Sequence, residues 1–187
     1  MDDVNLDEMI RGCKNGTPMY QKQLYHYCFS AMMKICLRYN KNTDDAAACY
    51  NTAMHKVFTK INQYKGEGSF LGWVQKCVVN TCISEIKKRV KFDYKNLEDN
   101  ENSFVAPEAS SNIEVKDILL LVQQLPANYS LVFNMYVMEG YNHVEVSKIL
   151  GISAGTSKWY LHEAKDKLKE KLEELYYNEA KSNEKYS

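Results

Sequence analysis

Residues that break helices are scarce in this chain, and their scarcity limits what it can fold into. The 187 residues include only three prolines and eight glycines, too few for the many turns of an all-β fold. Between these breaks, apolar residues recur every three or four positions, which is the spacing of one helix face. The pattern predicts an all-α protein.

The first part of the chain predicts four helices, over residues 5–14, 18–39, 43–62 and 70–90. Thr43, followed by two aspartates, is the expected N-cap of the third helix. The inward stripe of the second helix comprises Leu24, Cys28, Ala31, Met32, Ile35 and Tyr39. The stripe of the third comprises Ala46, Tyr50, Ala53, Val57 and Ile61.

An acidic segment, residues 93–112, follows these helices. It is rich in Asn, Ser and Glu and has no apolar period, which is typical of a linker. We therefore predict two small helical domains, over residues 1–91 and 113–176, joined by a flexible acidic linker over residues 92–112. A polar tail over residues 177–187 is expected to fray.

The second domain predicts helices over residues 113–124, 126–139, 142–150 and 154–176. The break between the last two is only Gly151-Ile152-Ser153. Gly151 suits the left-handed residue that ends a helix, and Ser153 suits the N-cap of the next. Two helices joined by so short a turn are typical of a helix-turn-helix.

The last predicted helix has a polar face near its start. Its inward positions are Ser157, Leu161, Ala164, Leu168, Leu172 and Leu175. That phase turns outward Lys158, Trp159, His162 and Lys165. Such side chains offer the donors, stacking surface and positive charge that contacts with duplex DNA require. An ordinary solvated helix face is the alternative.

The fourth helix offers a second candidate surface. Trp73, Lys76 and Asn80 share one face, and a basic run of Lys87, Lys88 and Arg89 follows. Rings that stack on bases, among cations that track phosphates, suit an unpaired strand. Alternatively, Trp73 is a core anchor and the basic run complements the helix dipole.

Two stretches resemble one known family. Residues 125–168 carry Leu125-Pro126, Glu139-Gly140-Tyr141 and Ile149-Leu150-Gly151-Ile152-Ser153, which resemble the promoter-reading C-terminal domain of bacterial RNA polymerase sigma factors. Residues 20–89 resemble the other conserved domain of that family. The matching positions there are Tyr64, Gly66, Ser69, Phe70, Trp73 and Asn80. Two such domains and no others are typical of the extracytoplasmic-function class.

The resemblance implies a DNA-binding protein that is not an enzyme and works with core RNA polymerase. From the composition and the residue spacing we expect a cytoplasmic protein without a cofactor or metal. An anti-sigma factor is a possible further partner. Contacts with duplex near −35 are implied for Lys158, Trp159, Tyr160, His162 and Lys165. Capture of single-stranded DNA near −10, with a flipped base held near residues 64–69, is implied for Tyr64, Lys65, Gly66, Ser69, Trp73, Lys76, Asn80, Lys87, Lys88 and Arg89.

Polymerase docking is implied for Asp44, Asp45, Asn51 and Lys56. The chain departs from the family there, because Ala47 and Ala48 replace acidic residues and Asn51 stands where glutamine is usual. The departures leave open how strongly this surface docks.

The six cysteines favour a reducing compartment. They form no CxxC pair, and the four histidines show no metal-ligand spacing, so we expect reduced thiols packed as small hydrophobic groups. A metal or catalytic-cysteine protein is the rival reading, and a lone helix-turn-helix regulator is another. The acidic N-terminus lacks a signal pattern, and no apolar run is long enough to insert in a membrane.

Charge and length bear on how such a chain would hold DNA. The 24 basic residues equal the 24 acidic residues, so few counterions would be released and binding to DNA alone should be weak. A linker of about 22 residues reaches at most about 73–79 Å, whereas two turns of DNA span about 70 Å. It bridges two promoter elements only when it is held extended.

Overall fold

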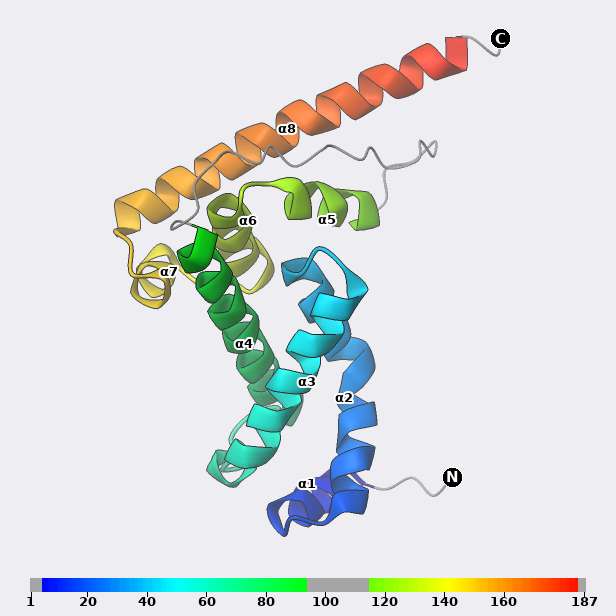
Figure 1. Cartoon of the computed structure of the whole chain (residues 1–187), viewed down its shortest axis with the longest axis vertical. Coiled ribbons are helices and arrows are strands. Elements are labelled where there is room, and N and C mark those ends of the chain that lie inside the picture. The colour runs from blue at the N-terminus through cyan, green and yellow to red at the C-terminus, as the bar shows by residue number, and fades with distance from the viewer. Residues whose placement is uncertain (1–4, 94–114, 185–187) are drawn as a thin grey trace. The chain divides into compact units, whose positions relative to one another are not determined.

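A computed structural model gives the fold of the chain (Figure 1). It describes the backbone over residues 5–93 and 115–184 and the side chains over residues 5–88 and 117–176. Within these ranges all regular structure is helical, as predicted. The chain divides into two compact units, unit 1 (Met1–Lys88) and unit 2 (Arg89–Ser187).

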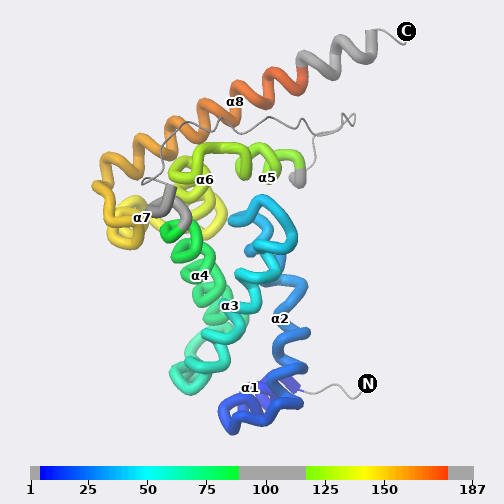
Figure 2. The backbone as a smooth tube through the Cα atoms, in the orientation of Figure 1, coloured from blue at the N-terminus to red at the C-terminus, as the bar shows by residue number. Residues whose placement is uncertain are grey.

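Unit 1 is built around α2 and α3, which run alongside each other in the backbone trace of Figure 2. α1 packs on the start of α2, where the ring of Tyr20 lies so close to Gly12 that a Cβ there would collide with it. The elements are α1 (Leu6–Lys14), α2 (Pro18–Tyr39), α3 (Thr43–Lys60), the 3-10 helix η1 (Ile61–Gln63) and α4 (Phe70–Asp93).

The core of unit 1 follows the predicted stripes with one exception. Ala31 is exposed, because its small side chain lies at the edge of the α2 stripe, whose other predicted members are buried. All five predicted positions of the third helix are buried. Removing such a stripe from water supplies most of the stability of a helix of this length.

The predicted N-cap of α3 is wrong by one residue. Asn42, and not Thr43, caps the helix, since its side-chain oxygen accepts a hydrogen bond from the backbone N–H of Asp45 at 2.8 Å. Thr43 is the first helical residue. Both residue types cap well, so the local sequence does not separate them.

All six cysteines are free thiols, and only Cys77 is partly exposed. Burial raises the pKa of Cys13 to about 11 and that of Cys28 to about 12, whereas a nucleophilic cysteine requires a lowered pKa.

The helices α5, α6 and α7 of unit 2 pack against the first half of α8, and Leu121, Val122, Leu125, Ala164 and Leu168 form the core cluster. Leu172 and Leu175 pack against this cluster, as predicted. The elements are α5 (Val115–Gln124), α6 (Ala127–Phe133), a π-helical turn η2 (Asn134–Met138), α7 (His143–Leu150) and α8 (Ala154–Glu184).

The predicted end of the last helix is wrong. α8 does not stop near Tyr176 but continues to Glu184, because residues 177–184 contain neither glycine nor proline to break the helix. The predicted linker lies almost wholly outside the described residues. None of the helices described is long and apolar enough to cross a membrane.

Candidate nucleic-acid interface

The helix-turn-helix is fixed by hydrogen bonds at each helix end. Asn142 and Glu145 form a capping box at the start of α7, with the Asn142 side chain accepting from the backbone N–H of Glu145 at 3.0 Å. Gly151 ends α7 at φ 72°, in the left-handed region as predicted. Ser153 then caps α8, since its hydroxyl oxygen accepts from the N–H of Thr156 at 2.9 Å. The turn therefore aims the start of α8 rigidly.

The polar face at the start of α8 is exposed, as its phase predicts. Lys158 and Lys165 lie at the surface, and the Trp159 side chain is 50% exposed. The His162 side chain is 70% exposed and lies 3.3 Å from the Asp166 carboxylate. We call these four residues, Lys158, Trp159, His162 and Lys165, the α8 face.

Tyr160 differs from the other predicted contacts because it turns back toward α6. Its hydroxyl accepts a hydrogen bond from the Asn128 amide at 3.4 Å, and its ring lies 5.5 Å from that of Tyr129. Tyr129 also meets the Trp159 ring edge-on at 5.8 Å. Tyr160 therefore supports the neighbouring Trp159 and offers little free surface.

His143 is a residue of this region that the sequence did not single out. Its ring stacks on Tyr136 at 4.4 Å, and its Nδ1 lies 3.0 Å from the Ser157 hydroxyl. Burial, followed by the charges of Lys158 and Lys165, lowers the pKa of His143. No local pattern marks the residue, because the contacts that matter come from α8 and η2.

In unit 1, the loop between η1 and α4 is tied by the Tyr64 side chain. The Tyr64 hydroxyl donates to the carbonyl of Gly68 at 2.8 Å. Gly66 and Gly68 have φ values of 83° and 74°, which side chains rarely adopt. The Lys14 ammonium of α1 donates to the Tyr64 carbonyl at 2.9 Å. These contacts hold a short loop in which residues 65–69 are exposed.

Three aromatic rings meet where this loop joins α4. Tyr64 and Phe70 lie 5.1 Å apart, and each lies 5.8 Å from Trp73. Phe70 is buried, whereas Tyr64 and Trp73 are only partly buried. Trp73 therefore rests on the core through Phe70 and still presents ring surface outside.

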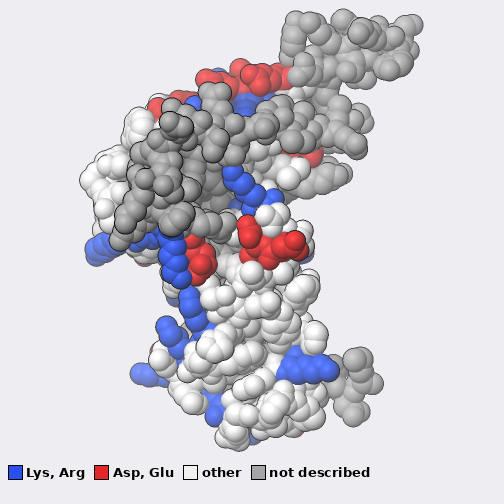
Figure 3. All heavy atoms as spheres, in the orientation of Figure 1, with Lys and Arg blue, Asp and Glu red and all other residues white. Residues whose placement is uncertain are grey.

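A polar stripe continues along α4. Lys76, Asn80 and Lys87 are exposed and, with Trp73, share one face at helical spacing. Figure 3 shows Lys and Arg side chains along α4 and around the loop before it.

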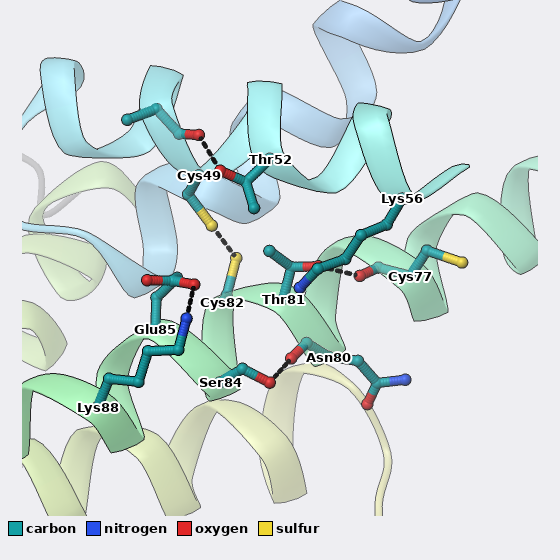
Figure 4. A network of polar contacts seen from close by, with 11 residues as sticks. Cys49, Thr52, Lys56, Cys77, Asn80, Thr81, Cys82, Ser84, Glu85 and Lys88 are labelled. Atoms are coloured by element: carbon teal, nitrogen blue, oxygen red, sulfur yellow. Dashed lines mark hydrogen bonds and ion pairs between the residues drawn. The ribbon is translucent and has the colours of Figure 1, made fainter. Parts of the chain in front are cut away.

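Most of the predicted strand-binding residues are accessible. Exposed with the stripe are Lys65, Gly66, Ser69 and Lys88. The Lys88 ammonium lies 2.9 Å from the Glu85 carboxylate (Figure 4). The side chain of Arg89 lies outside the described residues.

The predicted docking residues of α3 do not form one surface. Asp44 and Asn51 share an exposed face, and the Asn51 amide oxygen accepts from the Tyr25 hydroxyl at 2.7 Å. Lys56 points instead toward α4, where its ammonium donates to the Thr81 hydroxyl at 3.2 Å. Asp45 accepts from the Asn42 amide at 3.1 Å. Lys56 therefore ties α3 to α4.

Family models match the two helical parts in order. A model described as Sigma-70 region 2 matches residues 20–92, and one described as Sigma-70, region 4 matches residues 116–168. The first range holds the loop and the α4 stripe, and the second holds the helix-turn-helix.

Similarity to individual proteins points to the same family as the two models. The chain is 22% identical over 160 residues to ECF RNA polymerase sigma factor SigW of Bacillus subtilis, which covers 76% of this chain and 83% of that protein. It is 20% identical over 139 residues to ECF RNA polymerase sigma factor SigM of Mycobacterium tuberculosis, over 73% of this chain and 68% of that protein.

Among solved structures, the chain resembles the sigma factor RpoE in its complex with the anti-sigma factor NepR from Bartonella quintana. The TM-score is 0.52 at 18% identity, over 81% of this chain and 96% of that chain. At this identity the likeness shows a shared fold.

Proposed function

The chain belongs to the sigma-70 family, as a bacterial RNA polymerase sigma factor of the extracytoplasmic-function class, and we propose how its parts divide the work. As a sigma factor it binds core RNA polymerase and directs transcription initiation at specific promoters. RNA synthesis belongs to the core enzyme, so the chain needs no catalytic chemistry of its own. Its place of action is the cytoplasm, where the polymerase works.

The α8 face reads the duplex near −35. The observation that carries this assignment is the exposure of Lys158, Trp159, His162 and Lys165 at the start of a helix aimed by a tight turn. Lysine and histidine supply donors for base edges and phosphates, and the Trp159 ring supplies apolar contact. Tyr160 positions Trp159 both by direct ring contact and through Tyr129.

Unit 1 binds single-stranded DNA of the −10 element. The loop at residues 64–69 receives a flipped base, and Trp73 stacks on a neighbouring one. Extracting a base costs a few kcal/mol, and stacking returns about 1–3 kcal/mol per base. Phosphates contact Lys76 and Lys87 of the α4 stripe and the exposed Lys88 beside it. We also propose Arg89 for this role, from its place in the basic run of the sequence.

The exposed α3 face docks on the polymerase through Asp44 and Asn51. Asp45 lies at the same helix start, where two carboxylates face outward. Lys56 contributes by holding α3 against α4, as its contact with Thr81 supports. Ala47 and Ala48 reduce the charge of this surface relative to the family, so docking relies more on hydrogen bonding and apolar contact.

Residues 1–91 and 113–176 act as separate DNA-binding domains, and residues 92–112 join them. We propose that an anti-sigma factor regulates this chain, since the similar protein RpoE was solved in complex with the anti-sigma factor NepR. In this chain such a partner would cover the surfaces that dock on polymerase.

Run-off transcription tests the proposal directly. Core polymerase with the chain should give a transcript of defined start from a native promoter, and scrambling either the −35 or the −10 element should remove it. Core enzyme alone serves as the control. A transcript that survives both scrambled elements, or no transcript from a polymerase that the chain demonstrably binds, would overturn the proposal.

A further inference from the structure

Three cysteine thiols from three different helices meet in the core of unit 1. Cys36 of α2, Cys49 of α3 and Cys82 of α4 have sulfur atoms that all lie within 4.8 Å of one another. The sulfurs of Cys49 and Cys82 are 3.2 Å apart, and Figure 4 shows these two side chains pointing toward each other between α3 and α4. We call Cys36, Cys49 and Cys82 the thiol cluster.

The thiol cluster is shielded from water on every side. The exposed fractions of Cys36, Cys49 and Cys82 are 0%, 4% and 1%. One helical turn away on the same three helices lie Met32, Ala53 and Val78, all buried and apolar. Three soft sulfur donors therefore converge in a buried and mostly apolar site. The nearby Asn40 is a buried polar exception, and its amide donates to the Cys36 carbonyl at 2.8 Å.

A metal ion that enters this site displaces the thiol protons, because the thiolate and not the thiol is the metal ligand. A buried negative charge is costly, so the positive charge of the ion is what allows the thiolates to form in the core.

The spacing suits an ion with three sulfur ligands. A metal–sulfur bond of about 2.3 Å, the length found for zinc, separates the sulfurs of a planar three-coordinate site by about 4.0 Å. The sulfurs of the thiol cluster lie within 4.8 Å of one another, so small side-chain rotations bring them to that separation. Among the residues that the structure describes, no histidine or carboxylate completes a fourth corner.

We propose that the thiol cluster is a three-sulfur binding site for monovalent copper, a soft thiophilic ion. Soft thiolate ligands select this ion, whereas structural zinc takes four ligands and hard cations take oxygen. The three sulfurs bind as thiolates, and their protons pass to solvent. The ion offsets part of the negative charge of the three thiolates, and copper keeps its oxidation state.

Occupancy of the site would bind α2, α3 and α4 to one another. A ligand that binds the folded state alone raises its stability, so copper should stabilise unit 1. Since the thiols are buried, the ion enters only when the helices part locally, and binding to the folded protein should be slow. The site needs neither DNA nor polymerase, and it stands apart from the proposed function.

Competition with a colorimetric copper(I) chelator, under anaerobic conditions with a phosphine reductant, tests the site in the full chain. We expect one equivalent of copper to bind. Cys49→Ala and Cys82→Ala should each weaken copper binding by more than about 100-fold. Substitution of residues that only support the ligands already lowers metal affinity by about 10–100-fold, and these two variants remove a ligand itself. Cys28→Ala and Cys77→Ala, which alter cysteines outside the cluster, should bind within about twofold of the unaltered chain.

Two further measurements keep the test decisive where a cysteine variant folds poorly. X-ray absorption of the copper-loaded unaltered chain should show three sulfur neighbours, and copper should raise its melting temperature. Equal binding by Cys49→Ala, fewer than three sulfur neighbours, or tighter retention of Zn²⁺ than of copper in the same assay would each overturn the assignment.

Discussion

Gly151 and Asn142 fix the two ends of α7 by backbone chemistry. The Asn142 side chain satisfies N–H groups that the first turn leaves unpaired. Gly151 adopts a φ of 72° without a Cβ to oppose it. Gly151 lies where the sequence predicted a helix end, so local chemistry was enough to predict it, whereas the Asn142 cap was not predicted.

Gly151→Ala should destabilise unit 2 by about 1 kcal/mol, because it forces a side chain into the left-handed region. Gly155→Ala is the matched control. Gly155 is helical, and a Cβ there would meet only the Ser153 hydroxyl at 3.5 Å, so this change should be neutral or stabilising. Chemical denaturation monitored by circular dichroism measures both, and equal effects would contradict the cap assignment.

His143 should make the stability of unit 2 depend on pH. Its pKa is lowered in the folded state by burial and by Lys158 and Lys165, so the unfolded chain binds the proton more readily. Stability is therefore lost as pH falls from above the unfolded pKa of about 6.5. His143→Gln should flatten the fall in melting temperature, whereas Ser147→Ala, which removes only a hydroxyl contact, should keep it. An unchanged slope in His143→Gln would refute the argument.

At the scale of helices, sequence periodicity predicted most of the fold. The bounds of α2 match the prediction, and the outward phase of α8 is confirmed by the exposure of its polar side chains. Both follow from a spacing of 3.6 residues, which is a local property. The end of α8 was missed because no breaker marks it.

The sequence did not predict the side-chain contacts between helices. Lys56 turns to Thr81 on α4, Tyr160 turns to Asn128 on α6, and Cys49 meets Cys82 across 33 positions. Each depends on how two helices pack, which the period of either helix does not contain. The residues that the sequence placed correctly are those whose direction follows from their own helix.

The α8 face can be tested as a unit. Lys158→Ala combined with His162→Ala should lower transcription from promoters that depend on a −35 element by tenfold or more, since each base contact is worth about 1–3 kcal/mol. Binding to core polymerase should stay the same. The control is Lys169→Ala with Glu173→Ala, an ion pair farther along α8. Full transcription by the first variant would remove this assignment.

Trp73 tests the surface of α4. Trp73→Ala should impair transcription from duplex promoters more than from templates already unpaired near −10, because stacking worth about 1–3 kcal/mol is lost during opening. Trp73→Phe should retain most activity. Equal loss on both templates, together with reduced helical circular dichroism, would instead identify Trp73 as a core anchor.

At the scale of the whole molecule, the balance of charge determines how strongly the chain can bind DNA by itself. The chain has equal numbers of basic and acidic residues, so it should release few counterions when it binds DNA. A regulator that binds DNA on its own obtains much of its affinity from that release. The basic side chains are instead gathered on particular helices, such as the α4 stripe. A linker long enough to span two DNA turns only when extended also requires a larger partner to hold it.

The most direct test of the account compares the affinity of the chain for a native promoter duplex with and without core polymerase, at one physiological salt concentration, by fluorescence anisotropy. We predict binding of about 10⁻⁵ M or weaker for the chain alone, in the non-specific range, and of about 10⁻⁸ M or tighter for the complex. Tight, sequence-specific binding by the chain alone that core polymerase leaves unchanged would contradict the account.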